Sequence, residues 1–176
     1  MVLYIKQGSK GLGMSIERAK EHLKKWNAQD RVLEFSVSSA TVELAAQALH
    51  CKPAHIAKTL SLKIGERILL IVAAGDAKID NKKYKAKFGA KAAMQSFEEV
   101  EPGIGHAVGG VCPFGINTGV EVYLDISLKR FETVYPACGS ANSAIQLTIP
   151  ELEEFSQSRE WIDVCKGWEE EKEIQG

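Results

Sequence analysis

The sequence predicts an α/β protein of the α+β type, in which helices surround a mixed, largely antiparallel sheet that curls toward a barrel. The chain has 176 residues, of which 45% are hydrophobic, so it is long enough to bury one sizeable core. Two strand-like segments, 58–64 and 67–74, are separated by only two residues, which predicts a hairpin. Further strand-like and helix-like segments follow without a regular βαβ alternation, which disfavours a doubly wound parallel sheet.

The first fifty residues predict two helices and one strand. Glycines and the lack of sustained periodicity at 1–13 indicate a leader or a cloning remnant, so we expect a single domain over 14–168. Apolar residues recur at helical spacing after Ser15, which is the predicted N-cap of the first helix. Residues 31–37 form a strand candidate, and Thr41 is placed to cap the second helix.

The later elements are predicted from their turn and capping residues. Gly65, at the first central position of the hairpin loop, suits a type II′ turn. Ser96 and Glu99 match a capping box for a short helix that stops at Pro102. Thr148 begins a last, long helix, and an acidic tail is expected after it, at 169–176. Between these two helices, three segments are predicted as strands: 120–126, 132–137 and 144–149.

Charge and hydropathy exclude several classes of protein. The formal net charge is −1, so a nucleic acid has to be bound through a local patch and not through overall charge, and we expect no DNA partner. No apolar run approaches the roughly 18 residues that indicate a membrane span, and no signal-peptide pattern begins the chain. We therefore expect a cytoplasmic protein that does not bind membranes.

The cysteines and histidines predict neither a disulfide framework nor a metal centre. No Cys-x-x-Cys pair occurs, and the spacing of His50, Cys51 and His55 matches no zinc template. We expect reduced thiols, no metal and no cofactor. The four cysteines lie far apart in the chain, at Cys51, Cys112, Cys138 and Cys165.

A lysine stands on the apolar side of the predicted hairpin. Side chains two residues apart share a strand face, so Lys58 lies on the same face as Leu60, Leu62 and Ile64. Two interpretations are open. The ammonium either reaches into solvent at the rim, or it is a desolvated cation placed for an anionic ligand.

The segment 78–91 is rich in lysine, and Tyr84 and Phe88 lie on one side of the helix that it predicts. Either the lysines form the solvated face of an amphipathic helix, or they form a patch that binds a nucleic-acid backbone. The candidates for such binding are Lys82, Lys83, Lys85 and Lys87.

The stretch 106–115 combines glycines, a proline, a histidine and a cysteine, and two readings of it compete. In the first, Cys112 is a reactive thiol activated by His106. In the second, Gly109 and Gly110 adopt conformations that other residues avoid, and their amides polarise a carbonyl as an oxyanion hole does. In a plainer form of the second reading, the loop is only a tight turn that leads into the strand predicted at 120–126. Pro113 stiffens the loop in each case.

Several blocks in a fixed order carry a resemblance to a known family. They are Lys58-Thr59-Leu60, Gly75-Asp76, Gly109 to Gly115, Leu124 to Leu128, and Gly139 with Asn142. Together they resemble the YbaK/ProX/EbsC family of trans-editing aminoacyl-tRNA deacylases, which is related to the editing domain of prolyl-tRNA synthetase. The resemblance covers about residues 15–152 and implies a mixed α/β domain around a barrel-like sheet. It also implies hydrolysis of tRNA, here tRNA-Pro, that carries a wrong, small amino acid such as cysteine, alanine or serine.

The resemblance assigns roles to individual residues. Lys58 matches the family's essential lysine, which contacts the acceptor end or the ester, and Gly109 to Pro113 match its Gly-x-x-x-Pro loop. Asp125 matches a recurring acidic position, where it either orders the site by holding Lys58 or caps the chain after its strand. The catalytic candidates are therefore Lys58, Gly109, Gly110 and Asp125. The substrate-binding candidates are Thr59, Val111, Cys112, Pro113, Phe114, Gly139, Ser140 and Asn142.

The expected function is translational proofreading by ester hydrolysis, with mischarged tRNA as substrate and prolyl-tRNA synthetase as a partner. Many family members have serine where this chain has Cys112, which argues against an obligatory thiolate. No general base is evident in the sequence. Two alternatives stay open: a module that binds an acceptor end or a nucleotide without hydrolysing it, and a thiol enzyme that uses Cys112 and His106.

Overall fold

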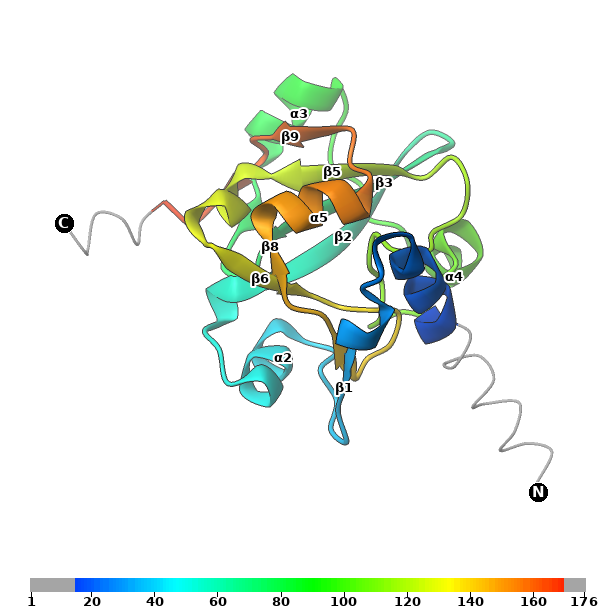
Figure 1. The fold of residues 1–176 in the computed structure, drawn as a ribbon. Coiled ribbons are helices and arrows are strands. Elements are labelled where there is room, and N and C mark those ends of the chain that lie inside the picture. Colours follow the sequence, from blue (N-terminus) through cyan, green and yellow to red (C-terminus); the bar gives the residue numbers. More distant parts are fainter. Residues whose placement is uncertain (1–14, 170–176) are drawn as a thin grey trace.

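The computed structural model describes residues 15–169 (Figure 1). The predicted leader at 1–13, and all but the first residue of the predicted tail at 169–176, lie outside the described residues. The first helix spans residues 15–23 and continues as the 3₁₀ turn η1 (Lys24–Trp26). Within 15–169, no helix combines the length and the apolar character needed to cross a membrane.

The predicted hairpin is confirmed and forms the centre of the fold. Strand β2 (Ile56–Ile64) pairs antiparallel with β3 (Arg67–Ala74). Gly65 has φ +56° and Glu66 has a negative φ, as a type II′ turn requires. The last six residues of β3 are buried, so this strand forms the middle of the core.

The sheet is mixed and curled, as predicted (Figure 1). Its six strands run in the order β8-β6-β2-β3-β5-β9. The β2–β3 and β6–β8 pairs are antiparallel, whereas β2–β6, β3–β5 and β5–β9 are parallel. Beside the hairpin lie β5 (Glu121–Asp125) and β6 (Thr133–Pro136), and the edge strands are β8 (Leu147–Thr148) and β9 (Glu160–Ile162).

Two small antiparallel ladders flank this sheet. The first pairs β1 (Leu33–Glu34) with β7 (Ser143–Ala144), so the strand predicted at 31–37 is short. The second pairs β4 (Lys78–Ile79) with β10 (Cys165–Lys166). The sequence predicted none of β4, β9 and β10, because segments of two or three residues are too short to show a period.

Two helices begin where their capping residues predict. Helix α2 (Val42–Leu49) starts after Thr41, whose side chain accepts from the Leu44 amide. Helix α5 (Ile149–Ser156) has the full capping box of Thr148 and Glu151. It is shorter than predicted, because Gln157 takes a left-handed conformation and ends it before β9. The remaining short turns are η2 (Gln29–Arg31), η3 (Pro53–His55) and η4 (Ile126–Arg130).

Helix α4 (Phe97–Ile104) differs from its prediction at both ends. The capping box is not formed: Ser96 donates to the Glu99 carboxylate, which is also ion-paired with Lys63. The helix also runs past Pro102 and ends at Gly105, which has φ +99°. Pro102 has no N–H to donate to the Glu98 carbonyl, so the helix lacks one interior hydrogen bond and still continues to Ile104.

Candidate functional site

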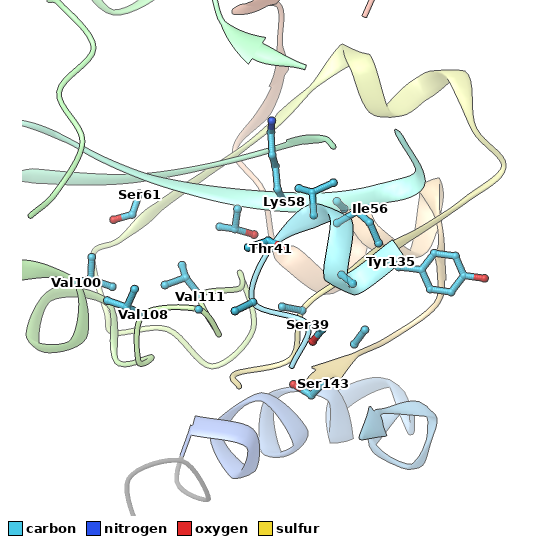
Figure 2. A pocket seen from close by; sticks show the side chains of 18 of the residues that line it. Ser39, Thr41, Ile56, Lys58, Ser61, Val100, Val108, Val111, Tyr135 and Ser143 are labelled. Atoms are coloured by element: carbon cyan, nitrogen blue, oxygen red, sulfur yellow. The ribbon is translucent and has the colours of Figure 1, made fainter. Parts of the chain in front are cut away.

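A pocket of about 440 Å³ opens beside the first half of β2 (Figure 2). One wall comes from β2 and includes Thr59 and Ser61, which share a strand face. The opposite wall comes from α4 and the loop after it, with Val100 and Val111. The remaining walls are the start of α2 with the residues before it, within 39–45, and the region around β6 and β7. Four parts of the chain thus enclose one space.

The mouth of the pocket has an apolar rim, formed by Met94, Phe97 and Val108. These side chains are 54%, 75% and 46% exposed although they are apolar. Sequence reasoning missed this rim. The sequence contained one sign of it. Phe97 is a large aromatic residue in the first turn of a helix, next to two acidic residues, where an exposed position is expected.

The pair formed by Cys112 and His106 is fully buried behind the pocket wall. Cys112 Sγ lies 3.5 Å from His106 Nε2. Burial raises the pKa of Cys112 to about 12 and lowers the pKa of His106 to about 4, so both groups are neutral at pH 7. His106 Nε2 also lies 2.6 Å from the Phe114 carbonyl oxygen, so this nitrogen carries the proton and cannot accept one from the thiol. The geometry favours a structural role for the pair.

The Gly-Gly turn packs tightly against a second loop. The Gly110 amide donates to the Ala107 carbonyl at 3.0 Å, so it is not free to bind a substrate. A Cβ at Gly110 would lie 2.4 Å from the backbone nitrogen of Ser140, which explains the glycine. The residues on either side, Gly109 and Val111, line the pocket, and within 15–169 their amides have no hydrogen-bond acceptor. These two amides are therefore the candidate donors for a bound carbonyl.

Lys58 lies at the edge of the pocket, and its ammonium is turned away from it. Figure 2 shows its side chain on the opposite side of β2 from Ser61 and Val111. The ammonium donates to the carbonyls of Gly75, at 3.3 Å, and Ala77. Burial lowers the pKa of Lys58, although neighbouring acidic groups oppose this shift. The lysine thus holds β2 against the segment that follows β3.

Asp125 is completely buried and does not contact Lys58. Its carboxylate accepts from the amides of Ser127, at 2.9 Å, and Val164, at 3.0 Å. It therefore caps η4 and fixes the turn that follows β9. Of the two roles that the sequence left open, this geometry matches the cap.

The loop that carries Gly139, Ser140 and Asn142 supports the pocket wall from behind. Ser140 Oγ donates to Ser143 Oγ at 2.8 Å, and Asn142 Nδ2 donates to the Phe35 carbonyl at 2.9 Å. Gly139 has φ +92°, and a Cβ there would lie 2.3 Å from the Ser15 oxygen. Among the predicted substrate-binding residues, Thr59 and Val111 line the pocket. Five others lie behind it, buried or within this loop: Cys112, Pro113, Phe114, Gly139 and Ser140.

Two of the four predicted tRNA-binding lysines are paired within the protein. They lie on α3 (Asn81–Phe88), which Figure 1 shows on the opposite side of the sheet from α2. Lys83 forms an ion pair with Asp163 at 3.0 Å, and Lys87 forms one with Glu160. Lys82 and Lys85 are exposed and have no ion pair with another described residue.

The described residues contain no group of three or more His, Cys, Asp or Glu side chains arranged to hold a metal. His55, one of the residues considered for this role, packs its ring against Phe131 with centroids 4.2 Å apart.

Comparisons with known proteins converge on one family. A sequence profile described as an aminoacyl-tRNA editing domain matches residues 37–155, a range that includes every residue lining the pocket. The uncharacterized protein YwhH of Bacillus subtilis (strain 168) is 57% identical over 157 residues, which is 89% of this chain and 100% of that protein. A proline–tRNA ligase of Bacillus cytotoxicus is 31% identical over 100 residues, which is 56% of this chain and 17% of the ligase. A solved structure described as a candidate trans-editing enzyme for prolyl-tRNA synthetase superposes with a TM-score of 0.78 at 28% identity, covering 87% of this chain and 98% of that one.

Proposed function

The chain belongs to the aminoacyl-tRNA editing domain family, and from this premise we propose that it hydrolyses tRNA charged with a wrong, small amino acid. One observation carries the proposal: a pocket with two unused backbone amides, Gly109 and Val111, lies entirely within the matched range. Editing by hydrolysis needs a space for the aminoacyl group and donors for its carbonyl oxygen, and this pocket offers both.

The reaction is the addition of water to the ester carbonyl. As the bond from water oxygen to the carbonyl carbon forms, negative charge develops on the carbonyl oxygen, where the Gly109 and Val111 amides donate hydrogen bonds. The bond from the carbonyl carbon to the ribose oxygen then breaks, and the ribose oxygen takes up the proton that the water loses. The products are the free amino acid and the tRNA with its terminal hydroxyl restored.

Positioning can supply most of the rate enhancement for such an ester. An aminoacyl ester is already activated, so fixed donors and a held water lower the barrier without a strong base. The ribose 2′-hydroxyl of the substrate can relay the proton. Cys112 does not serve as nucleophile in this scheme, because its raised pKa keeps it a thiol and His106 offers it no basic nitrogen.

The walls of the pocket favour a small, uncharged amino acid. Val100, Val108 and Val111 present methyl groups, whereas Thr59 and Ser61 bring hydroxyl groups to the β2 side. One methylene in an apolar pocket changes binding by only roughly 1–3 kcal/mol. We therefore expect overlapping activity on cysteinyl, alanyl and seryl esters.

The acceptor end has two points of support in this proposal. Phe97, at the rim, offers an exposed aromatic face on which the terminal base can stack. Lys58 supplies a positive charge at the pocket edge, where it acts on the acceptor end and not on the ester, since its ammonium is held on the other side of β2. We propose tRNA-Pro as the carrier and prolyl-tRNA synthetase as a partner, because the comparisons include a proline–tRNA ligase.

A deacylation panel tests the proposal. The protein is incubated with tRNA-Pro charged with cysteine, alanine, serine or proline, and the ester that remains is measured over time. The proposal predicts hydrolysis of at least one of the three small mischarged esters and little hydrolysis of the proline ester. Binding of all four without hydrolysis would instead identify a module that only holds the acceptor end.

A further inference from the structure

Two lysines face each other across the small ladder between β4 and β10. Lys78 and Lys166 are register partners in this antiparallel pair, and both are exposed. Residues directly opposite in such a ladder have Cβ atoms about 4.5–5.5 Å apart, and like charges placed there destabilise the pairing. A ladder of two residues on each strand has few other interactions to offset this cost.

Among residues 15–169, no acidic side chain forms an ion pair with either of the two lysines. Neither ammonium forms a hydrogen bond or an ion pair with any residue in 15–169. Two acidic residues nearby are already engaged: Asp76 binds Arg130 in a bidentate pair, and Asp163 binds Lys83. Asp80 interacts with Lys166 at longer range, but its carboxylate caps α3 by accepting from two amides. The positive charge of the ladder is therefore available to a ligand.

The ladder continues the cationic edge of the pocket. Lys58 donates to the carbonyl of Ala77, the residue directly before Lys78, and Lys58 itself lines the pocket. Burial lowers the pKa of Lys58, and the positive charge of Lys78 acts in the same direction. We call Lys58, Lys78 and Lys166 the lysine row. It leads away from the pocket edge across the segment that follows β3 and onto β10.

We propose that the lysine row binds the phosphodiester backbone of the RNA strand whose aminoacylated end enters the pocket. This inference rests on the proposed function and names the path of the acceptor end. Successive phosphates are a chain of single negative charges, and a row of ammonium groups can bind them one by one without reading the bases. The bound phosphates would also offset the repulsion between Lys78 and Lys166.

Lys78 and Lys166 differ from Lys83 and Lys87 of α3, because they have no acidic partner within 15–169. Lys83 and Lys87 are both paired with acidic residues, so their removal would expose carboxylates as well as delete cations. The residues of the row come from β2, β4 and β10, which are far apart in the sequence. A surface assembled in this way is not visible as a basic run in the chain.

The test is RNA binding, which does not depend on hydrolysis. The probe is a minihelix made of an acceptor stem with a single-stranded 3′ CCA end, and its Kd is measured by fluorescence anisotropy from 50 to 300 mM KCl. The logarithm of the association constant falls as log salt rises. Loss of two single-strand phosphate contacts makes this slope shallower by about 1.4 and weakens binding about 25-fold at 0.1 M. We expect this change for the double variant Lys78→Gln/Lys166→Gln. Its melting temperature should equal or exceed that of the wild type, because the repulsion is removed.

The matched control is Lys25→Gln/Lys129→Gln, which removes the same charge from two exposed lysines that also have no acidic partner within 15–169. It should leave the slope unchanged. The inference is overturned if the Lys78/Lys166 variant keeps the wild-type slope, if the control lowers the slope equally, or if the variant melts earlier than the wild type. If the protein deacylates tRNA but the binding test fails, only the proposed role of the lysine row is refuted. If the binding test succeeds but no ester is hydrolysed, only the proposed reaction is refuted.

Discussion

Replacing Gly110 by alanine and Cys112 by serine separates the backbone mechanism from the thiol mechanism. The Cβ of alanine at position 110 would lie 2.4 Å from the nitrogen of Ser140 and 2.5 Å from the carbonyl carbon of Gly139. Both are backbone atoms of a loop held by its own hydrogen bonds, so the glycine turn has to move instead. That movement carries the amides of Gly109 and Val111 away from the substrate carbonyl.

The size of the effect follows from the displacement. Relief of a 2.4 Å contact to an ordinary separation requires a shift on the order of 1 Å, which is enough to break an oxyanion hydrogen bond. Loss of one such donor costs roughly 2.7–4 kcal/mol, so kcat for Gly110→Ala should fall about 100- to 1,000-fold. Cys112→Ser keeps the backbone and nearly the same volume in a fully buried position, so its effect should stay within about tenfold.

The assay is single-turnover deacylation of the preferred mischarged tRNA with both variants. Circular dichroism melts verify that each variant is folded at the assay temperature. Gly109→Ala is a useful third variant, because its Cβ meets only ordinary contacts at 3.4 and 3.6 Å while its φ of +92° strains it. It should lie between the other two. An inactive Cys112→Ser beside an active Gly110→Ala would refute the backbone account and favour the thiol enzyme.

Three further predictions concern the pocket edge, its rim and the buried histidine. Lys58→Ala should keep the far-ultraviolet spectrum and lose at least tenfold in kcat/KM; a folded variant with full activity would remove Lys58 from the site. Phe97→Ala should raise KM about tenfold at constant kcat, since stacking of one base is worth about 1–3 kcal/mol, and Phe97→Tyr should restore KM. The pKa of His106 is about 4 in the folded protein against 6.5 ordinarily, so the unfolded state takes up the proton first as the pH falls below 6.5. Urea unfolding should therefore show a loss of about 2 kcal/mol by pH 5 that is absent in His106→Gln, and equal pH slopes in the two proteins would contradict this.

The parts of the fold that are fixed locally were predictable from the sequence. Gly65 specifies the hairpin turn through its positive φ, and Thr41 and Thr148 cap their helices through hydrogen bonds to their own neighbours. The failed capping box at Ser96 shows the limit of this reasoning. Glu99 is also drawn to Lys63 on β2, a residue 36 positions away, and local sequence gives no sign of that pairing.

The candidate site shows the same division. The glycine loop and Lys58 could be singled out from the sequence, but their hydrogen bonds could not. The sequence suggested both glycine amides as donors, whereas the structure engages Gly110 in the turn and leaves Gly109 and Val111. Contacts between distant segments decide which donors stay free, and a single sequence does not encode them in a readable pattern.

The measurement that tests the central claim most directly is a crystal structure with a non-hydrolysable substrate analogue. In such an analogue the ester of 3′-alanyl adenosine is replaced by an amide, so the carbonyl remains and hydrolysis stops. The account predicts the alanyl group in the pocket beside β2, with its carbonyl oxygen about 2.7–3.1 Å from the amide nitrogens of Gly109 and Val111. An analogue seated in the pocket with its carbonyl beyond hydrogen-bond reach of both nitrogens, or bound elsewhere on the protein, would contradict it.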